Sequence, residues 1–168
     1  LPAGKTSLLH GHFSRNYNLP TFNDRFWETL DNSTLSPEKG YSADIGWKFN
    51  RKHFGADLTA FHLLLDDWIL WSPGSVDGIF RPGNLRKVSS RGLELGAQLN
   101  YKFWRINWKL KGQAQWSETK NKAVYDGNQA ALGKQLPYTP GLSAGGGLWA
   151  RKGAFSGVYL HQFTGSRF

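Results

Sequence analysis

Three observations predict that this 168-residue chain is an all-β protein of antiparallel, up-and-down strands. Apolar residues recur at every second position over long stretches, the connections between these stretches are alternately long and short, and no stretch shows the period of a helix. Because the side chains of a strand point alternately to its two faces, the alternation predicts strands with one apolar and one polar face. About seven strands are expected, at residues 5–15, 38–50, 53–71, 86–103, 105–118, 141–151 and 153–164.

The strands differ in how clearly their alternation can be followed. It is regular over residues 41–49, is interrupted in the next strand by the run Leu63–Leu65, and is clearest in "RGLELGAQLNYKFWRINWKLKGQAQWSE" at residues 91–118. This last segment predicts a hairpin that turns near residues 104–105. One face of the hairpin carries Leu93, Leu95, Leu99, Tyr101, Ile106, Trp108 and Leu110. The opposite face carries Glu94, Gln98, Asn100, Lys109, Lys111, Gln113 and Gln115.

The connections alternate in length along the chain. The short ones are "NRKH", "FWR" and "RKG", and long polar segments separate the other strands. In an up-and-down sheet every second connection lies at the same end, so all the long loops are expected at one end and all the tight turns at the other. Outer-membrane barrels keep this segregation, whereas the Greek-key connections of soluble sandwiches mix the two kinds.

Strand length and the positions of aromatic residues favour the same class. The hairpin strands run for about eleven residues, close to the 9–11 that a tilted strand needs to cross a hydrocarbon core, whereas soluble strands are typically nearer five or six. Aromatic residues also cluster beside the short turns, where an interfacial girdle would place them. We therefore expect about seven strands of a larger transmembrane β-barrel, with the apolar hairpin face toward lipid and the polar face toward the lumen.

Composition excludes several alternatives. The 21 Lys and Arg residues outnumber the 12 Asp and Glu residues, but the basic groups at residues 51–52, 102–105 and 151–152 are small and lie near tight turns, so no nucleic-acid partner is expected. The absence of Cys excludes disulfides and thiolate metal sites within the chain. The chain has no Met and starts at Leu1, so we expect it to be a piece of a longer protein.

No catalytic constellation, metal site or cofactor site is expected. His10 and His12 share one strand face, but no third metal ligand is evident. Asp66 and Asp67 are adjacent, so they would point to opposite faces and make a poor acid–base pair. Aromatic and charged residues in the long loops are instead candidate contacts for an extracellular small-molecule ligand. They are Trp27, Trp71, Phe80, Arg81, Tyr125 and Asp126.

Four segments resemble, in this order, the barrel of TonB-dependent outer-membrane receptors. They are "FSRNYNLPTFNDRFW", "STLSPEKGYSADIGW", "RKVSSRGLELGAQLNY" and "GKQLPYTPGLSAGGGLW". More narrowly, they resemble the vitamin B12 and siderophore receptor group of Bacteroidota-type bacteria. The matching positions are residues 19–22, then Leu35, Pro37 and Glu38, then residues 91–94, and finally residues 136–140. The second segment departs from the family pattern, because "NST" stands where "NP" is usual.

The resemblance implies a receptor in the outer membrane of a Gram-negative bacterium. Such receptors have barrels of roughly 22 strands with an N-terminal plug. They import a scarce nutrient, of the iron-siderophore or cobalamin type, with energy from the TonB complex. Residues 1–168 would then be a partial barrel without the plug, the TonB-binding region or the last strands, and unable to transport alone. Gly46 and Gly96, on the polar face, would mark tight curvature or a close approach of the plug.

One alternative comes from another functional class. A soluble all-β ligand- or carbohydrate-binding module could use exposed Trp side chains, but it would need a second sheet to cover the apolar face. A β-sheet hydrolase is not favoured, because no base–nucleophile pair can be named in the sequence.

Overall fold

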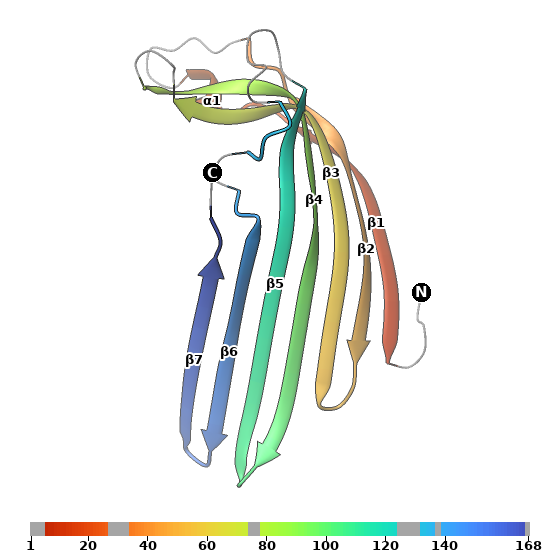
Figure 1. The fold of residues 1–168 in the computed structure, drawn as a ribbon, viewed down its shortest axis with the longest axis vertical. Helices are drawn as coiled ribbons and strands as arrows, with labels where there is room; N and C mark the ends of the chain where they lie inside the picture. Colours follow the sequence, from red (N-terminus) through yellow and green to blue (C-terminus); the bar gives the residue numbers. More distant parts are fainter. Residues whose placement is uncertain (1–5, 27–33, 74–77, 124–131, 137–138, 167–168) are drawn as a thin grey trace.

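The computed structural model describes residues 6–26, 34–73, 78–123, 132–136 and 139–166 of the chain. It is a single curved layer of seven antiparallel strands in the order β1-β2-β3-β4-β5-β6-β7, with β1 and β7 at the edges (Figure 1). The strands are β1 Ser7–Asn18, β2 Glu38–Asn50, β3 Phe54–Pro73, β4 Phe80–Phe103, β5 Ile106–Ala123, β6 Leu142–Lys152 and β7 Phe155–Thr164. Each strand pairs with its neighbours in sequence, which confirms the up-and-down topology.

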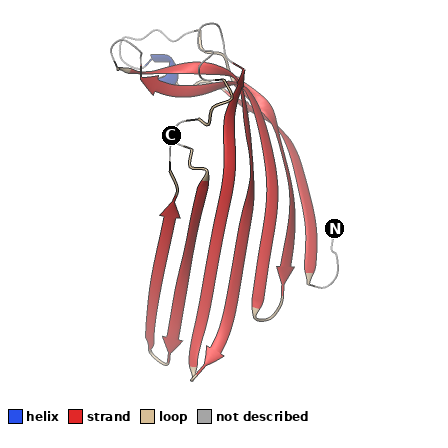
Figure 2. Ribbon diagram, in the orientation of Figure 1, coloured by secondary structure: helices blue, strands red, loops and turns tan. Residues whose placement is uncertain are grey.

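Two expectations about the elements are wrong in detail. The hairpin strands β4 and β5 contain 24 and 18 residues instead of about eleven, because pairing continues beyond the alternating segment into residues 80–87 and 119–123. The first long connection also contains a short helix, α1 Phe22–Phe26 (Figure 2). Five residues are too few to show a helical period in the sequence. Among the described residues, no helix is long and apolar enough to cross a membrane.

The short turns all lie at one end of the sheet and the long connections at the other, as expected (Figure 1). The β4–β5 turn consists of Trp104 and Arg105, with φ angles of 50° and 64°. Positive φ at both central positions is typical of the type I′ turn, whose twist matches that of the paired strands. Trp104 is 78% exposed and stacks on Phe103, with ring centroids 5.3 Å apart. We name the two ends the short-turn end and the long-loop end.

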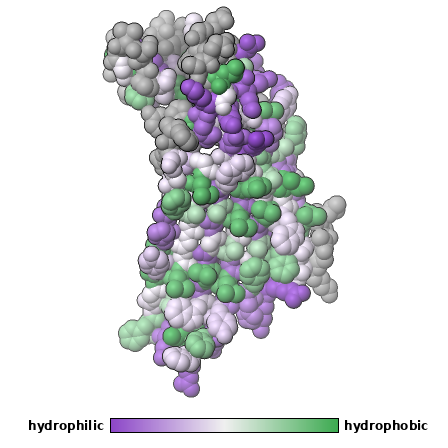
Figure 3. All heavy atoms as spheres, in the orientation of Figure 1, coloured by the Kyte–Doolittle hydropathy of each residue, from purple (hydrophilic) through white to green (hydrophobic). Residues whose placement is uncertain are grey.

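The register divides the side chains between two faces. Directly opposed residues share a face, and Leu99↔Leu110, Tyr101↔Trp108 and Leu95↔Leu58 are opposed on one of them. We call this the apolar face. Figure 3 shows it, with a broad band of apolar residues across the strands and hydrophilic residues gathered above the band. The other face is called the polar face.

Near the long-loop end, β3 and β4 bend away from the direction of the rest of the sheet (Figure 1). Asp67 has φ 59° and is skipped in the pairing, which passes from Asp66↔Lys87 to Trp68↔Leu85. A second irregularity lies at Lys87/Val88, where β4 shifts register against β5. The second irregularity is a β-bulge, which bends a strand and increases its twist, whereas the first leaves the β3–β4 register unchanged. The bend carries the end of the β3–β4 pair over the long-loop end.

Glycines on the polar face make room for side chains of the neighbouring strand. A Cβ atom added at Gly46 would lie 2.3 Å from Cε1 of His10, and one at Gly96 would lie 2.5 Å from Oδ1 of Asp57. The structure thus shows a local role for both glycines, and tight curvature or a close approach of the plug at these positions stays a prediction. Both residues are directly opposite the side chain they accommodate in the register.

Candidate functional site

The polar face forms a broad wall of hydrogen-bonding groups. All seven residues expected there lie on this face, because each is displaced by one position from a residue of the apolar face. A shallow hollow of about 880 Å³ runs across β2 to β7, and Glu94, Gln98, Lys111, Gln113 and Gln115 are among the residues that line it. Asn100 and Lys109 line a second hollow nearer the short-turn end. Amide, carboxylate and ammonium groups can bind polar solutes or water but form no catalytic arrangement.

Both signs of charge occur along this wall. Carboxylates lie at Asp57 on β3 and Glu94 on β4. Cations lie on both sides of them, at Lys48 on β2, directly opposite Asp57, and at Lys109 and Lys111 on β5 with Arg151 on β6. The pairing Glu94↔Gln115 and the pairing Lys109↔Trp149 place these residues on the same face. A polar solute at the wall would therefore meet carboxylates on β3 and β4 with cations on both sides of them.

The two histidines do not form a metal site with any third residue. Nδ1 of His12 lies 3.5 Å from Oδ2 of Asp44, directly opposite on β2. His10 is opposite Gly46, one pair along the same face, and its Nδ1 atom is buried without a hydrogen-bond partner. Within the described ranges, no group of three His, Cys, Asp or Glu residues could hold a metal ion.

Three of the six candidate ligand contacts lie in the described part of the chain. Nε1 of Trp71 donates a hydrogen bond of 2.8 Å to Oδ1 of Asp24, so this indole anchors the first long connection onto β3. Phe80, at the start of β4, is 46% exposed, and Arg81 follows it with a partly covered side chain. Trp27, Tyr125 and Asp126 fall outside the described residues.

The segment "LPTFND" forms the N-terminus of α1, which a hydrogen bond connects to β3. Thr21 caps α1 by accepting a hydrogen bond from the Asp24 amide, and the Asp24 carboxylate accepts bonds from both the amide and the hydroxyl of Thr21. This reciprocal pattern is a capping box. Partial burial raises the pKa of the Asp24 carboxyl, but the hydrogen bonds from Thr21 and Trp71 outweigh it, and the pKa lies below its usual 3.8.

The segment "LSPE" joins three strands. Oε2 of Glu38 accepts a bond of 3.0 Å from Asn18 on β1, and its Oε1 accepts a bond of 2.8 Å from the backbone amide of Ile69 on β3. Just before it, the amide of Ser36 donates to Oδ1 of Asn84, and Nδ2 of Asn84 donates to the carbonyls of Ser36 and Asp67. Leu35 is buried beside this junction, with only 9% of its surface exposed.

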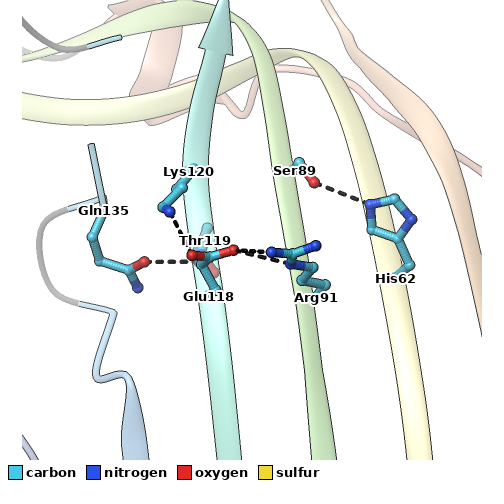
Figure 4. A network of polar contacts seen from close by, with 7 residues as sticks. All are labelled: His62, Ser89, Arg91, Glu118, Thr119, Lys120 and Gln135. Carbon is cyan, nitrogen blue, oxygen red and sulfur yellow. Dashed lines mark hydrogen bonds and ion pairs between the residues drawn. The ribbon is translucent and has the colours of Figure 1, made fainter. Parts of the chain in front are cut away.

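Arg91, in the segment "SRGLE", takes part in an ion-pair cluster with Glu118 and Lys120 of β5 (Figure 4). Nη2 of Arg91 lies 2.7 Å from Oε2 of Glu118, and Nζ of Lys120 lies 2.5 Å from Oε1 of the same carboxylate. Beside it, Nε2 of His62 is 3.0 Å from Oγ of Ser89. These residues extend over β3, β4 and β5, directly above the apolar band.

The segment "LGKQLPYTP" is attached to the free edge of β5. The Leu136 amide donates to the Thr119 carbonyl at 2.8 Å, and the Thr119 amide donates to Oε1 of Gln135 at 3.0 Å. Leu136 is 5% exposed, and on β4 the nearby Val88 is 2% exposed. The buried apolar residues of the described chain, Leu35, Val88 and Leu136, therefore lie at the long-loop end.

Residues 4–168 match the family model "TonB dependent receptor-like, beta-barrel". The chain belongs to this family. Its members are transporters and receptors rather than enzymes, and they are barrels of the outer membrane.

Curated relatives of this TonB-dependent receptor chain include two vitamin B12 transporters. The chain is 30% identical over 81 residues to the vitamin B12 transporter BtuB of Vibrio vulnificus, and 27% identical over 84 residues to that of Photobacterium profundum. Each match covers 48% of the chain, and 13% and 14% of the two relatives respectively. The matched segment therefore spans about one seventh of each relative.

Two solved structures share the fold of the receptor chain. The copper transporter OprC superposes with a TM-score of 0.74 at 22% identity, over 96% of this chain and 24% of OprC. The FrpB iron transporter from Neisseria meningitidis (F3-3 variant) superposes with a TM-score of 0.56 at 17% identity, over 89% of this chain and 23% of that one. These likenesses confirm an up-and-down strand arrangement of the barrel type.

Sequence reasoning did not single out Asn84, Glu118 or Gln135. For Glu118 a signal was present, because pairing counted back from the turn at Trp104 and Arg105 places it opposite Arg91. For Asn84 no local signal exists, because its partner Ser36 is 48 residues away in the sequence. The four recognisable segments thus include residues that fasten loops and strands to one another at the long-loop end.

Replacing Asn84 with alanine is expected to loosen the first long connection of the receptor. The change leaves the amide and carbonyl of Ser36 and the carbonyl of Asp67 without their side-chain partner, and each unsatisfied buried group costs about 1–3 kcal/mol. Hydrogen–deuterium exchange of the full-length receptor should show faster exchange at Ser36. Asn100→Ala, on the polar face, is the matched control and should leave that exchange unchanged.

Proposed function

We propose that the chain is one part of the wall of an outer-membrane importer, with its apolar face toward lipid and its polar face toward the lumen. The observation that carries this proposal is the exposure of the apolar face: Leu93, Leu95 and Leu99 are each between 42% and 52% exposed. A soluble protein rarely leaves so large a contiguous apolar surface uncovered. Lipid would solvate this apolar surface, and water in the barrel lumen would solvate the polar face.

The height of the apolar band supports this orientation. On β4 it extends from Leu93 to Phe103, ten residue steps of about 3.4 Å each, or about 34 Å along the strand. A strand tilted by about 45° would span about 24 Å of the membrane normal, close to the apolar band of about 25 Å in outer-membrane barrels. The exposed Trp104 and Phe103 then fall at the interface of the short-turn end, and the long loops face outward.

The cargo we propose is a scarce nutrient of the cobalamin or iron-siderophore type, imported with energy from the TonB complex. Support comes from the family, from the curated relatives named as vitamin B12 transporters, and from the exposed Phe80 at the long-loop end. Among the described candidates, we propose Phe80 and Arg81 as ligand contacts. We also propose the loop residues Trp27, Tyr125 and Asp126, which lie outside the described part of the chain. Trp71 would act chiefly by holding the first loop in place, since its indole N–H already binds Asp24.

The soluble binding module remains the rival function, and it would require a cover for the apolar face. The described residues form one seven-stranded sheet with no second layer. Cell fractionation of the full-length protein in its own host separates the two functions. We expect an outer-membrane band that migrates differently with and without boiling, and growth on limiting cobalamin or iron-siderophore that depends on the gene. A soluble band that does not shift would favour the rival.

A further inference from the structure

A polar cluster begins on the apolar face one residue pair above the band. Leu93↔Trp116 is the last apolar pair of β4 and β5, the next pair on this face is Arg91↔Glu118, and the one after it includes Lys120. Figure 3 shows the hydrophilic residues above the apolar band on this face. In the proposed orientation the cluster lies at the outer boundary of the hydrocarbon core.

Glu118 fixes two cations of the cluster in place (Figure 4). Its Oε2 accepts from both Nη2 and Nε of Arg91, at 2.7 and 2.9 Å, and its Oε1 accepts from Nζ of Lys120 at 2.5 Å. A guanidinium has five N–H groups and an ammonium has three, so both cations retain donors that point elsewhere. The Arg91 side chain is 63% exposed, which leaves those donors accessible.

These cations border a hollow that also contains apolar side chains. The hollow has a volume of about 580 Å³, and its lining includes His62, Leu64, Arg91, Trp116, Lys120 and Lys122. Three lining residues are cationic and one, Glu118, is anionic, so the charged lining is net positive. Trp116, in the last apolar pair with Leu93, connects the hollow to the apolar band below it, whereas Leu64 is opposite Ser89 on the long-loop side of Arg91.

We propose that this hollow binds the phosphorylated headgroup of a membrane lipid, whose acyl chains lie along the apolar band. The inference rests on the lipid-facing orientation proposed above. Arginine donates paired hydrogen bonds to phosphate oxygens and lysine adds a point charge, so the preset pair of Arg91 and Lys120 suits a phosphate group. A free anion would gain nothing from Trp116 and the apolar band below it, whereas a lipid places its chains beside them. The site would hold a boundary lipid against β3, β4 and β5.

The test uses the full-length receptor, purified from outer membranes and analysed by native mass spectrometry. The probes are bis-phosphorylated lipid A and the same lipid after enzymatic removal of its phosphates. The test variant combines Arg91→Gln, Lys120→Gln and Lys122→Gln. The matched control combines Lys102→Gln, Lys109→Gln and Lys111→Gln, which removes three cations from the polar face of the same hairpin. Lys122→Gln alone serves if the triple variant does not assemble.

The triple variant is expected to bind phosphorylated lipid A about 100-fold more weakly and Lys122→Gln about fivefold more weakly, while the control keeps the wild-type affinity. Wild-type receptor should also prefer the phosphorylated probe. Equal binding by all variants, equal binding of both probes, or displacement of the lipid by an equal concentration of inorganic phosphate would overturn the lipid site. If the lipid site fails in a receptor that fractionates with the outer membrane and shifts on boiling, the barrel proposal still stands. If the receptor is soluble, the barrel proposal itself is overturned.

Discussion

Leu95→Arg is expected to impair assembly of the full-length receptor by about 1–3 kcal/mol, somewhat less than the about 2–4 kcal/mol of an arginine at the membrane midplane, because Leu95 lies only two residues from the outer end of the apolar band. Leu95 lies inside the apolar band, opposite Leu58 on β3 and Ala114 on β5. Its side chain is 52% exposed, so the substitution leaves no core cavity, and the cost must come from placing the charge in lipid. The fraction of receptor that migrates as a folded barrel without boiling measures the effect.

Gln98→Arg is the matched control for this prediction. Gln98 lies three positions further along β4 and faces the opposite side, where it lines the polar hollow. The same arginine there should be tolerated, because it remains in contact with water. Equal losses at the two positions, or none at either, would show that the apolar face is not in lipid.

Gly92→Ala is expected to destabilise the receptor by about 1–3 kcal/mol, in the range of overpacked sites. A Cβ atom at position 92 would lie 2.3 Å from the carbonyl oxygen of Trp116 and 2.7 Å from the ring of Phe61. The first of these is a backbone atom of the paired strand, which can move only if the β4–β5 ladder is distorted. A lowered temperature for loss of the folded, unboiled band would measure the change.

Gly112→Ala provides the comparison within the same hairpin. No atom lies within 4 Å of a Cβ added at Gly112, on the apolar face of β5. Its substitution should be neutral or slightly stabilising, since alanine reduces the conformational entropy of the unfolded chain. If Gly92→Ala behaves in the same way, the close packing of Phe61 over Gly92 does not contribute to stability.

The register of β4 and β5 could be predicted from sequence because alternation and a two-residue turn together determine it. The ends of these strands could not, since residues 80–87 and 119–123 pair without a clear apolar period. The run Leu63–Leu65 breaks the alternation for a physical reason. Leu65 is opposite Val88, which is 2% exposed, so this leucine of the polar face lies beside a buried apolar side chain.

The hydrogen bonds that hold the first long connection at the long-loop end could not be predicted from the sequence either. Ligand contact by Trp71 stays a prediction, but the sequence does not predict the hydrogen bond of its indole N–H to Asp24, 47 residues away. Asn84 and Ser36 meet across a similar distance in the chain. Such contacts depend on how the first long connection crosses the ends of β3 and β4, which no local pattern encodes.

The most direct test of the central claim is the accessibility of single cysteines along β4, within the segment from Gln98 to Tyr101. The chain contains no cysteine, and once any cysteine of the remaining receptor is replaced with serine, each introduced thiol reports on one position. Gln98→Cys and Asn100→Cys in outer membranes should react with a water-soluble maleimide, while Leu99→Cys and Tyr101→Cys should react only after detergent extraction. An alternating pattern would place lipid against one face and water against the other. Uniform labelling of all four positions would contradict the account, because it would mean that water reaches both faces.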